Sequence, residues 1–184
     1  MATALTKQNL ILTKELNSIL IGLILGDASV FKTSITSNAR IEMSFGQKYI
    51  SFAEHIALLL EGFMSNPLKE VKIKHSKVEG DKTYINYRIK TKTLPLFNHY
   101  HDLFYSYDEV NKKYKKIVPL NIHDLMDPIV LAYLIMTDGN YDKGRNRVRI
   151  YTNSFTKMEV ESLAKAIEAK LGIYTGVLYD RNDQ

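Results

Sequence analysis

Two segments of the chain repeat one order of apolar, small and acidic residues. Residues 20–28 read LIGLILGDA and residues 131–139 read LAYLIMTDG, so Asp27 and Asp138 occupy the same place in each copy. A helix that is apolar nearly all round is typical of the interior of a protein. We therefore expect two buried helices, each of which carries an aspartate at its carboxyl end.

Strand-like and helical patterns follow each copy in the same order. Period-two alternation, as in residues 40–45, predicts half-buried strands. A capping box at Thr156 and Glu159 predicts the start of a helix that ends at Gly172. The predicted strands are 29–35, 40–45, 71–75, 84–90, 147–153 and 173–179, and the predicted helices are 14–27, 48–64, 94–104, 128–138 and 157–171.

The repeat predicts an α+β fold made of two pseudo-symmetric αββαββα units with antiparallel sheets. The first half is predicted at 1–105, a polar, lysine-rich connector at 106–126, and the second half at 127–184. The second half reaches the turn of its second hairpin at the last residues of the sequence, so we expect this unit to be C-terminally incomplete. Its return strand and the following helix would then be lacking, or would come from elsewhere.

Composition narrows the classes of function. The chain has 184 residues, a net charge of +5 and no cysteine, which excludes disulfides and thiolate metal sites. The positive charge favours a polyanionic partner, although many basic proteins bind nothing anionic. The apolar runs are too short to cross a bilayer, so no membrane partner is expected. The N-terminal residues carry acid and lack a continuous apolar core, so no secretory signal or targeting peptide is visible.

The polar faces of the predicted strands carry side chains that can bind nucleic acid. Arg and Lys pair with guanine or phosphate, and Asn pairs with adenine. Half-exposed strands in many proteins carry polar residues for solvation alone, so this pattern by itself leaves both interpretations open. The candidate DNA-binding residues are Arg40, Ser44, Lys72, Lys74, Tyr84, Asn86, Arg88, Lys90, Arg147, Arg149 and Tyr151.

Asp27 and Asp138 stand where a carboxylate is unfavourable. A negative charge at the carboxyl end of a helix meets the negative end of the helix dipole unless a cation compensates. A turn would explain one such aspartate, because Asp followed by a small residue is common there. Two equivalent copies favour a shared metal site instead. Paired carboxylates suit Mg²⁺ (or Mn²⁺), which keeps water and phosphate ligands and supports phosphodiester hydrolysis.

With these features, LIGLILGDA and LAYLIMTDG resemble the two copies of the LAGLIDADG motif. From residue 15 onward the chain is similar to the single-chain, two-motif homing endonucleases that organellar introns encode. Ala28 replaces the final glycine of the first motif and Thr137 precedes the aspartate of the second, and neither change is expected to disturb the motif. The resemblance implies saddle-shaped sheets that lie in the DNA major groove, and a metal-dependent double-strand break with 3′ overhangs.

The resemblance also implies roles for named residues. Asp27 and Asp138 would bind the divalent metal, and Lys116 matches a basic residue near the scissile phosphate. Within its lysine-rich run, Lys116 is equally explained as a solvated lysine. Gln47 and Asn153 resemble catalytic-site polar residues at strand ends that hold a network of water molecules. Asn153 fits the polar face of its predicted strand, whereas the parity of Gln47 points to the core unless a bulge intervenes.

Three functions remain open at the level of the sequence. The first is a site-specific homing endonuclease that acts as a monomer on a long double-stranded DNA target. The second is a maturase that binds intron RNA on the same scaffold, although retention of both aspartates favours the nuclease. The third is a DNA-binding remnant, which the incomplete second half suggests. The resemblance implies a gene in a mitochondrion or chloroplast.

Overall fold

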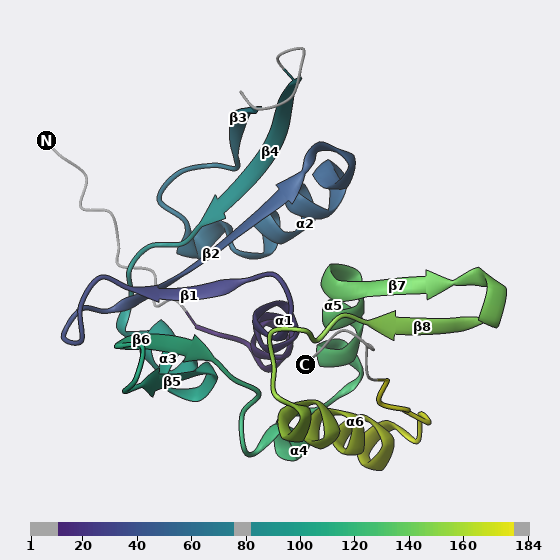
Figure 1. Cartoon of the computed structure of the whole chain (residues 1–184). Coiled ribbons are helices and arrows are strands. Elements are labelled where there is room, and N and C mark those ends of the chain that lie inside the picture. The colour runs from purple at the N-terminus through teal and green to yellow at the C-terminus, as the bar shows by residue number, and fades with distance from the viewer. Residues whose placement is uncertain (1–10, 76–81, 179–184) are drawn as a thin grey trace, which may run out of the picture.

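Helices and antiparallel strands alternate along the chain, as the pattern predicted, and the α+β class is confirmed. A computed structural model describes residues 11–75 and 82–178 (Figure 1). Its elements are α1 (Lys14–Leu25), β1 (Ser29–Lys32), β2 (Ala39–Gly46), η1 (Gln47–Tyr49), α2 (Ile50–Leu59), η2 (Glu61–Phe63), β3 (Lys69–His75), β4 (Lys82–Lys90), η3 (Pro95–Phe97), α3 (Asn98–Phe104), β5 (Tyr105–Asp108), β6 (Lys113–Lys116), α4 (Ile122–Leu125), α5 (Pro128–Asp138), β7 (Gly139–Asp142), η4 (Lys143–Arg145), β8 (Arg147–Ile150) and α6 (Lys157–Leu171).

The two motif helices, α1 and α5, lie side by side at the centre of the molecule (Figure 1). An antiparallel sheet of four strands, in the order β1-β2-β4-β3, belongs to the first half. The strands β5 and β6 form one hairpin, and β7 and β8 form another. In the described part of the chain, no helix is both long enough and apolar enough to cross a membrane.

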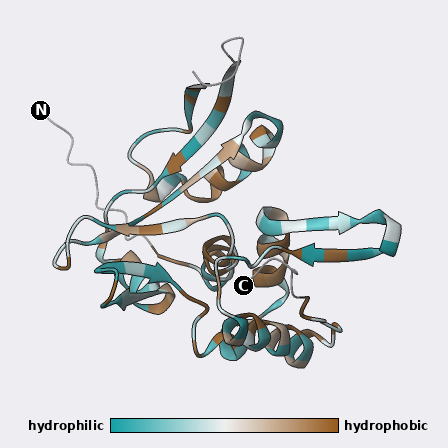
Figure 2. Ribbon diagram, viewed as in Figure 1, coloured by the Kyte–Doolittle hydropathy of each residue, from teal (hydrophilic) through white to brown (hydrophobic). Residues whose placement is uncertain are grey.

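The helix α1 forms the buried spine of the fold. The Thr13 hydroxyl accepts a hydrogen bond from the Leu16 N–H and caps the first turn. Every residue from 16 to 25 except Asn17 is buried. Figure 2 shows the apolar residues gathered on this central helix. The prediction of a helix buried on nearly all sides is therefore confirmed for the first copy of the motif.

Two glycines on α1 let the central helices approach closely. A Cβ atom built on Gly22 would lie 2.5 Å from the Val130 carbonyl oxygen and 2.9 Å from the Tyr133 Cβ. A Cβ atom on Gly26 would overlap the side chain of Thr137. Gly22 and Tyr133 occupy equivalent places in the two copies of the motif, and so do Gly26 and Thr137. The helices therefore pack in parallel with the repeat in register, and their carboxyl ends meet.

The second motif helix is less buried than the sequence predicted. Within α5, the buried residues are Val130, Leu131 and Leu134, while Met136 is 47% exposed. The helix α1 covers one side of α5, but the neighbouring hairpin β7–β8 has two strands and offers little further cover. The expectation that both motif helices bury nearly all of their surface is therefore wrong for α5.

The strands of the second half are shorter than predicted. The strand expected at 147–153 ends at Ile150, and residues 173–178 form no strand, so both expectations are wrong. Val148 on β8 is 51% exposed, because an isolated pair of strands has little surface to pack against.

The helix α6 begins and ends as its sequence predicted. The Thr156 hydroxyl and the Glu159 carboxylate form the reciprocal capping box. Gly172 ends the helix with a left-handed φ of 65°, which a glycine adopts without strain. The local signals at both ends of this helix were therefore sufficient to define it.

The predicted connector contains a hairpin that the sequence analysis did not anticipate. The strands β5 and β6 pair in antiparallel register across a turn. The Asp108 carboxylate accepts hydrogen bonds from the Val110 and Asn111 N–H groups in this turn, and Lys112 has a positive φ of 51°. Lysine is a poor strand former, so the lysine-rich run concealed the strand. The proposed boundaries of the two halves remain a prediction.

Substitution of Gly22 by alanine should separate the central helices. The new methyl group would meet the Val130 carbonyl, which belongs to helix backbone and has little freedom to move. We expect Gly22→Ala to lower the free energy of unfolding by about 1–3 kcal/mol, measured by urea denaturation, even though alanine favours helix.

The matched control is Gly46→Ala. Gly46 has a φ of −67°, and no atom lies within 4 Å of a Cβ built there, so this substitution should leave the stability unchanged or slightly higher. Equal stability of the Gly22→Ala and Gly46→Ala proteins would contradict the close helix contact.

Candidate active site and nucleic-acid interface

The structure brings Asp27 and Asp138 together at the carboxyl ends of the central helices. Asp138 is the last residue of α5 and is partly buried, whereas Asp27 lies in the turn after α1 and is exposed. Asp27 is therefore not buried, although the helix that precedes it is. Burial, together with the negative charge and hydrogen-bonding contact of Asp27, raises the pKa of Asp138 to about 6, while the positive charge of Lys116 acts in the opposite direction. Two carboxyl groups thus share one small region.

Lys116 reaches the same region from β6. Its Nζ donates hydrogen bonds to the carbonyl oxygens of Gly26, at 2.5 Å, and Ala28, at 3.0 Å, which flank Asp27 in the chain. Burial lowers the pKa of Lys116 to about 8, although the charges of Asp138 and Asp27 act in the opposite direction. These contacts show that Lys116 is not a freely solvated member of its lysine run.

The groups gathered here fit a divalent cation of the magnesium type. Both side-chain ligands would be carboxylates. Burial and the negative charge of Asp27 raise the pKa of Asp138, and a bound cation would offset both effects. In the two described ranges, no group of three or more His, Cys, Asp or Glu residues gathers as a self-sufficient metal site. Water and substrate phosphates would complete the coordination, as Mg²⁺ commonly requires.

Gln47 follows the end of β2, and Asn153 lies outside the strand on which it was predicted. Gln47 begins η1 directly after β2 and is exposed, so the alternation of the strand no longer determines its direction. Asn153 lies in an exposed turn after β8, so its place on the polar face of a strand is wrong. The roles proposed for both residues in a water network remain predictions.

One face of the four-stranded sheet gathers most of the predicted DNA-binding residues of the first half. Direct cross-strand neighbours lie on the same face of a sheet. The opposite face packs on the core through Ile41, Met43, Phe45 and Ile89. The residues that the register places on the first face are Ser29, Phe31, Arg40, Glu42, Ser44, Lys69, Val71, Ile73, Tyr84, Asn86, Arg88 and Lys90.

Lys72 does not share this face. The register pairs Lys72 with Ile85, so Lys72 lies on the face that carries Ile89, and Val71 and Ile73 take the places predicted for lysines. Alternation along β3 could not reveal this, because a shift of one residue in the pairing exchanges the two faces of a strand. The side chain of Lys74 lies outside the described part of the chain.

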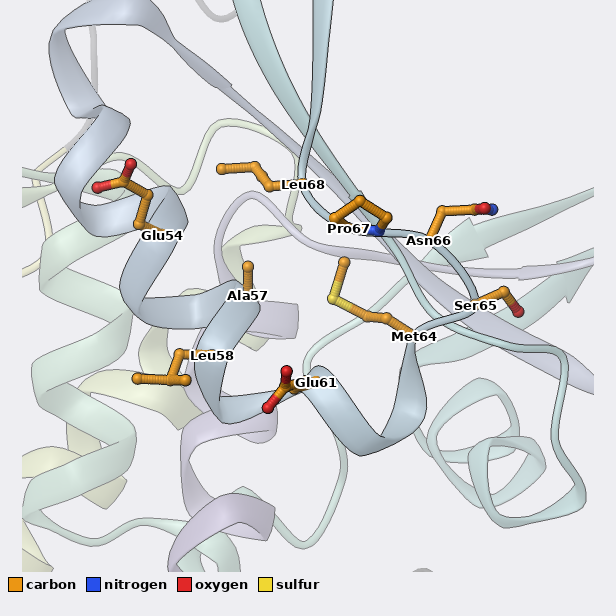
Figure 3. A pocket seen from close by; sticks show the side chains of 9 residues that line it. All are labelled: Glu54, Ala57, Leu58, Glu61, Met64, Ser65, Asn66, Pro67 and Leu68. Carbon is orange, nitrogen blue, oxygen red and sulfur yellow. The ribbon is translucent and has the colours of Figure 1, made fainter. Parts of the chain in front are cut away.

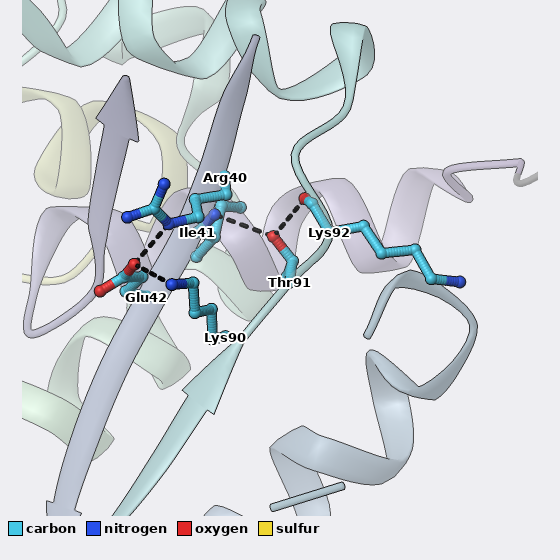
Figure 4. Close-up of polar contacts among 6 residues, drawn as sticks. All are labelled: Arg40, Ile41, Glu42, Lys90, Thr91 and Lys92. Atoms are coloured by element: carbon cyan, nitrogen blue, oxygen red, sulfur yellow. Dashed lines mark hydrogen bonds and ion pairs between the residues drawn. The ribbon is translucent and has the colours of Figure 1, made fainter. Parts of the chain in front are cut away.

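Glu42 organises two of the cations on this face. Its Oε1 lies 2.5 Å from Arg40 Nε and 3.5 Å from Lys90 Nζ (Figure 4). Burial acts to raise the pKa of Glu42, but the two cations hold it below its ordinary value. Arg40 also lies 4.2 Å from the centre of the Phe31 ring. Neither Glu42 nor Phe31 was predicted as a site residue. Glu42 shares the alternation of Arg40 along β2, whereas Phe31 is placed opposite Arg40 only by the register of β1 with β2.

Lys69 and Arg88 are exposed and directly opposite each other on β3 and β4. Neither of them forms an ion pair with a described residue. Like charges in this position destabilise a sheet, so an anionic ligand would relieve the repulsion. The sequence analysis missed Lys69, because the length of β3 was underestimated.

The hairpin of the second half holds its arginines in a similar way. Asp142 Oδ2 lies 3.2 Å from Arg147 Nε and 3.3 Å from Arg149 Nη2. Asn140 Nδ2 donates a hydrogen bond of 3.1 Å to the Tyr151 hydroxyl. Asn140, Asp142 and the two arginines lie on one face of the hairpin. The predicted residues of the second half are thus grouped, and the acid between them was not anticipated.

A separate open hollow of about 470 Å³ lies beside α2 (Figure 3). Its lining comes from α2, η2 and the segment that leads into β3. It contains none of the predicted site residues, so it is not part of the candidate active site. The lining residues are Glu54, Ala57, Leu58, Glu61, Met64, Ser65, Asn66, Pro67 and Leu68.

Comparison with known proteins gives a consistent result. The sequence model of the LAGLIDADG DNA endonuclease family matches residues 17–184. DNA endonuclease I-ChuI from Chlamydomonas applanata is 26% identical over 170 residues, which cover 89% of this chain and 76% of that protein. Cytochrome b mRNA maturase bI2 from Debaryomyces hansenii is 27% identical over 165 residues, which cover 88% of this chain and 59% of that protein.

A solved structure shares the fold. The homing endonuclease I-WcaI, determined bound to its DNA recognition sequence, aligns with a TM-score of 0.79 and 23% identity. The alignment covers 93% of this chain and 74% of that protein. The arrangement of helices and antiparallel sheets described above is therefore that of a known architecture.

Removal of one negative charge from the aspartate pair should stabilise the protein. The pKa of Asp138 is raised to about 6 in the folded state, above its ordinary value in the unfolded chain, so ionisation of Asp138 disfavours folding. This unfavourable contribution is absent below pH 4, grows between pH 4 and 6, and stays constant above pH 6. We expect Asp138→Asn to raise the melting temperature at pH 7.5 and to match the unsubstituted protein near pH 4.

The control for this experiment is Asp124→Asn, since Asp124 is largely exposed on α4. It should change the melting temperature little at either pH. A melting temperature of Asp138→Asn that equals or falls below that of the unsubstituted protein at pH 7.5 would contradict the repulsion between the two aspartates.

Proposed function

We propose that this chain, which belongs to the LAGLIDADG DNA endonuclease family, is a site-specific homing endonuclease. It would cut both strands of a long DNA target with the aid of a divalent metal. The observation that carries the proposal is the meeting of Asp27, Asp138 and Lys116 at one point. The predicted resemblance to this family is confirmed by the match over residues 17–184. The 3′ overhangs and the identity of the metal as Mg²⁺ or Mn²⁺ are part of the proposal.

Each residue of the centre has a distinct task in phosphodiester hydrolysis. Asp27 and Asp138 would hold the divalent cation against the scissile phosphates. The cation, when bound, supplies positive charge beside the phosphate and makes water more acidic. Lys116 is close enough for the charges of both carboxyl groups to act on its pKa, and it adds a positive charge that can stabilise the charge developing on the phosphate. Hydrogen bonds to two carbonyl groups fix the position of that charge.

The sheet face of the first half would supply most of the DNA contacts. Arg40 and Lys90 are held in place by Glu42 before any ligand binds, which lowers the entropic cost of binding. Lys69 and Arg88 present unneutralised charge to phosphate groups. Arg147, Arg149 and Tyr151 would extend the interface on the second half. One chain provides both aspartates, so a monomer suffices for the centre.

An RNA maturase is the second candidate function. The specific observation in its favour is the similarity to cytochrome b mRNA maturase bI2 over 165 residues. That similarity also supports an organellar gene within an intron. Both candidates use the same basic faces, and they differ in whether the aspartates are needed.

Cleavage by the full chain tests the first candidate. The substrate is a supercoiled plasmid library that carries intron-free segments of organellar genes. We expect linear product with Mg²⁺ and none with Ca²⁺, read on an agarose gel. Nicked circles alone would show that the chain cuts one strand and would contradict a double-strand break. Absence of any cleavage, together with salt-resistant binding to intron RNA, would favour the maturase.

Substitution of the aspartates separates catalysis from binding. We expect Asp27→Asn or Asp138→Asn to lower the rate of cleavage of the selected target at least about 100-fold, because each removes a ligand of the cation. DNA affinity in Ca²⁺, measured by gel shift, should change little, and Asp124→Asn should cleave normally. Full cleavage by either substituted protein would remove these residues from the metal site.

A further inference from the structure

We propose that Tyr105 is a positioning residue of the candidate active site: its hydroxyl holds the backbone that follows Asp27, so that the Asp27 carboxylate stays in place. The inference rests on the proposed function, in which Asp27 binds a divalent cation. The hairpin β5–β6, which lies in the predicted connector, would then support the candidate active site.

The first observation is the contact between the Tyr105 hydroxyl and β1. The Val30 N–H donates a hydrogen bond of 3.0 Å to the Tyr105 hydroxyl oxygen. Since β1 is an edge strand of its sheet, the side of β1 that faces away from β2 has no neighbouring strand in the four-stranded sheet. The Tyr105 hydroxyl therefore accepts a hydrogen bond from an edge-strand N–H group that a neighbouring strand would otherwise bind.

The second observation is that Tyr105 and Lys116 lie opposite each other in the hairpin and contact the same segment of the chain. They are direct cross-strand partners in β5 and β6. Lys116 binds the carbonyl oxygens of Gly26 and Ala28, and Tyr105 binds the N–H of Val30. The two side chains thus hold residues 26–30 on both sides of Asp27. The carboxylate of Asp27 is exposed, so its position depends largely on this backbone.

The third observation is that another aromatic ring packs against the ring of Tyr105. The ring of His101, which is buried, stacks on it with centroids 5.1 Å apart and an interplanar angle of 8°. The Tyr114 ring packs on the edge of His101 at 4.7 Å. Burial raises the pKa of Tyr105, so its hydroxyl stays protonated at neutral pH. A stacked ring with a fixed hydroxyl is suited to positioning a backbone segment.

The variant that tests this inference is Tyr105→Phe, which keeps the ring and the stack but removes the hydroxyl. The matched control is Tyr107→Phe, on the same hairpin, whose ring packs on Tyr114. Both variants lose one tyrosine hydroxyl. They differ in that the hydroxyl of Tyr105 contacts the segment after Asp27.

Three measurements are made on the full chain. Hydrogen exchange of the Val30 amide, followed by NMR, reads the contact itself. Mn²⁺ binding, followed by electron paramagnetic resonance, reads the metal affinity without cleavage. The Mg²⁺ concentration that gives half-maximal single-turnover cleavage reads the effect on the proposed reaction, and the melting temperature reports any general loss of stability.

We expect Tyr105→Phe to speed exchange at Val30, to weaken Mn²⁺ binding about 10-fold and to raise the half-maximal Mg²⁺ concentration by a similar factor. The cleavage rate at saturating Mg²⁺ and the DNA affinity in Ca²⁺ should change less than the metal dependence. Tyr107→Phe should match the unsubstituted chain in all measurements. A general structural effect would instead lower the melting temperature and the DNA affinity together, and would overturn the inference.

The outcomes also distinguish this inference from the proposed function. If the unsubstituted chain binds Mn²⁺ but cuts no DNA, the proposed function fails, and the Mn²⁺ affinities of the two variants still decide the role of Tyr105. Equal Mn²⁺ affinities of Tyr105→Phe and Tyr107→Phe would overturn the inference, and so would an unsubstituted chain that binds no Mn²⁺.

Discussion

The close contact between α1 and α5 is the constraint on which the rest of the structure depends. Gly22 and Gly26 remove side chains where the second helix needs room, so the two copies of the motif pack in register. That packing carries Asp27 and Asp138 to a common point. It also has an energetic consequence, because the partial burial of Asp138 and the negative charge of the neighbouring Asp27 raise the pKa of Asp138. The packing of α1 against α5 therefore also creates the pair of carboxyl groups that would bind a cation.

The candidate active site is assembled from three parts of the chain that are distant in sequence. The motif helices supply the carboxylates, and the hairpin β5–β6 supplies Lys116 and Tyr105. Lys116 contributes charge as well as hydrogen bonds, whereas Tyr105 contributes position alone. The lysine-rich hairpin therefore supports the segment that carries Asp27, and the partly buried centre contains a cation of its own beside the two acids.

The two halves share a motif, but their sheets differ in size. The first half has a four-stranded sheet whose core face is buried and whose other face carries the Arg40–Glu42–Lys90 network. Among its described residues the second half has two strands, and its motif helix remains partly exposed. Basic side chains in both halves are nevertheless held by an acid, Glu42 in one and Asp142 in the other. Such pairing orders long basic side chains before they meet an anionic surface.

Features that depend on local chemistry and on the repeat could be predicted from the sequence. The motif helices, the capping box of α6, the glycine at its end and the pair of aspartates all follow from short patterns. Tertiary structure alone decided the face on which Lys72 lies, because pairing register is a relation between two strands. It also decided the exposure of α5 and the contact of Tyr105 with Val30, since burial and long-range hydrogen bonds depend on which elements become neighbours.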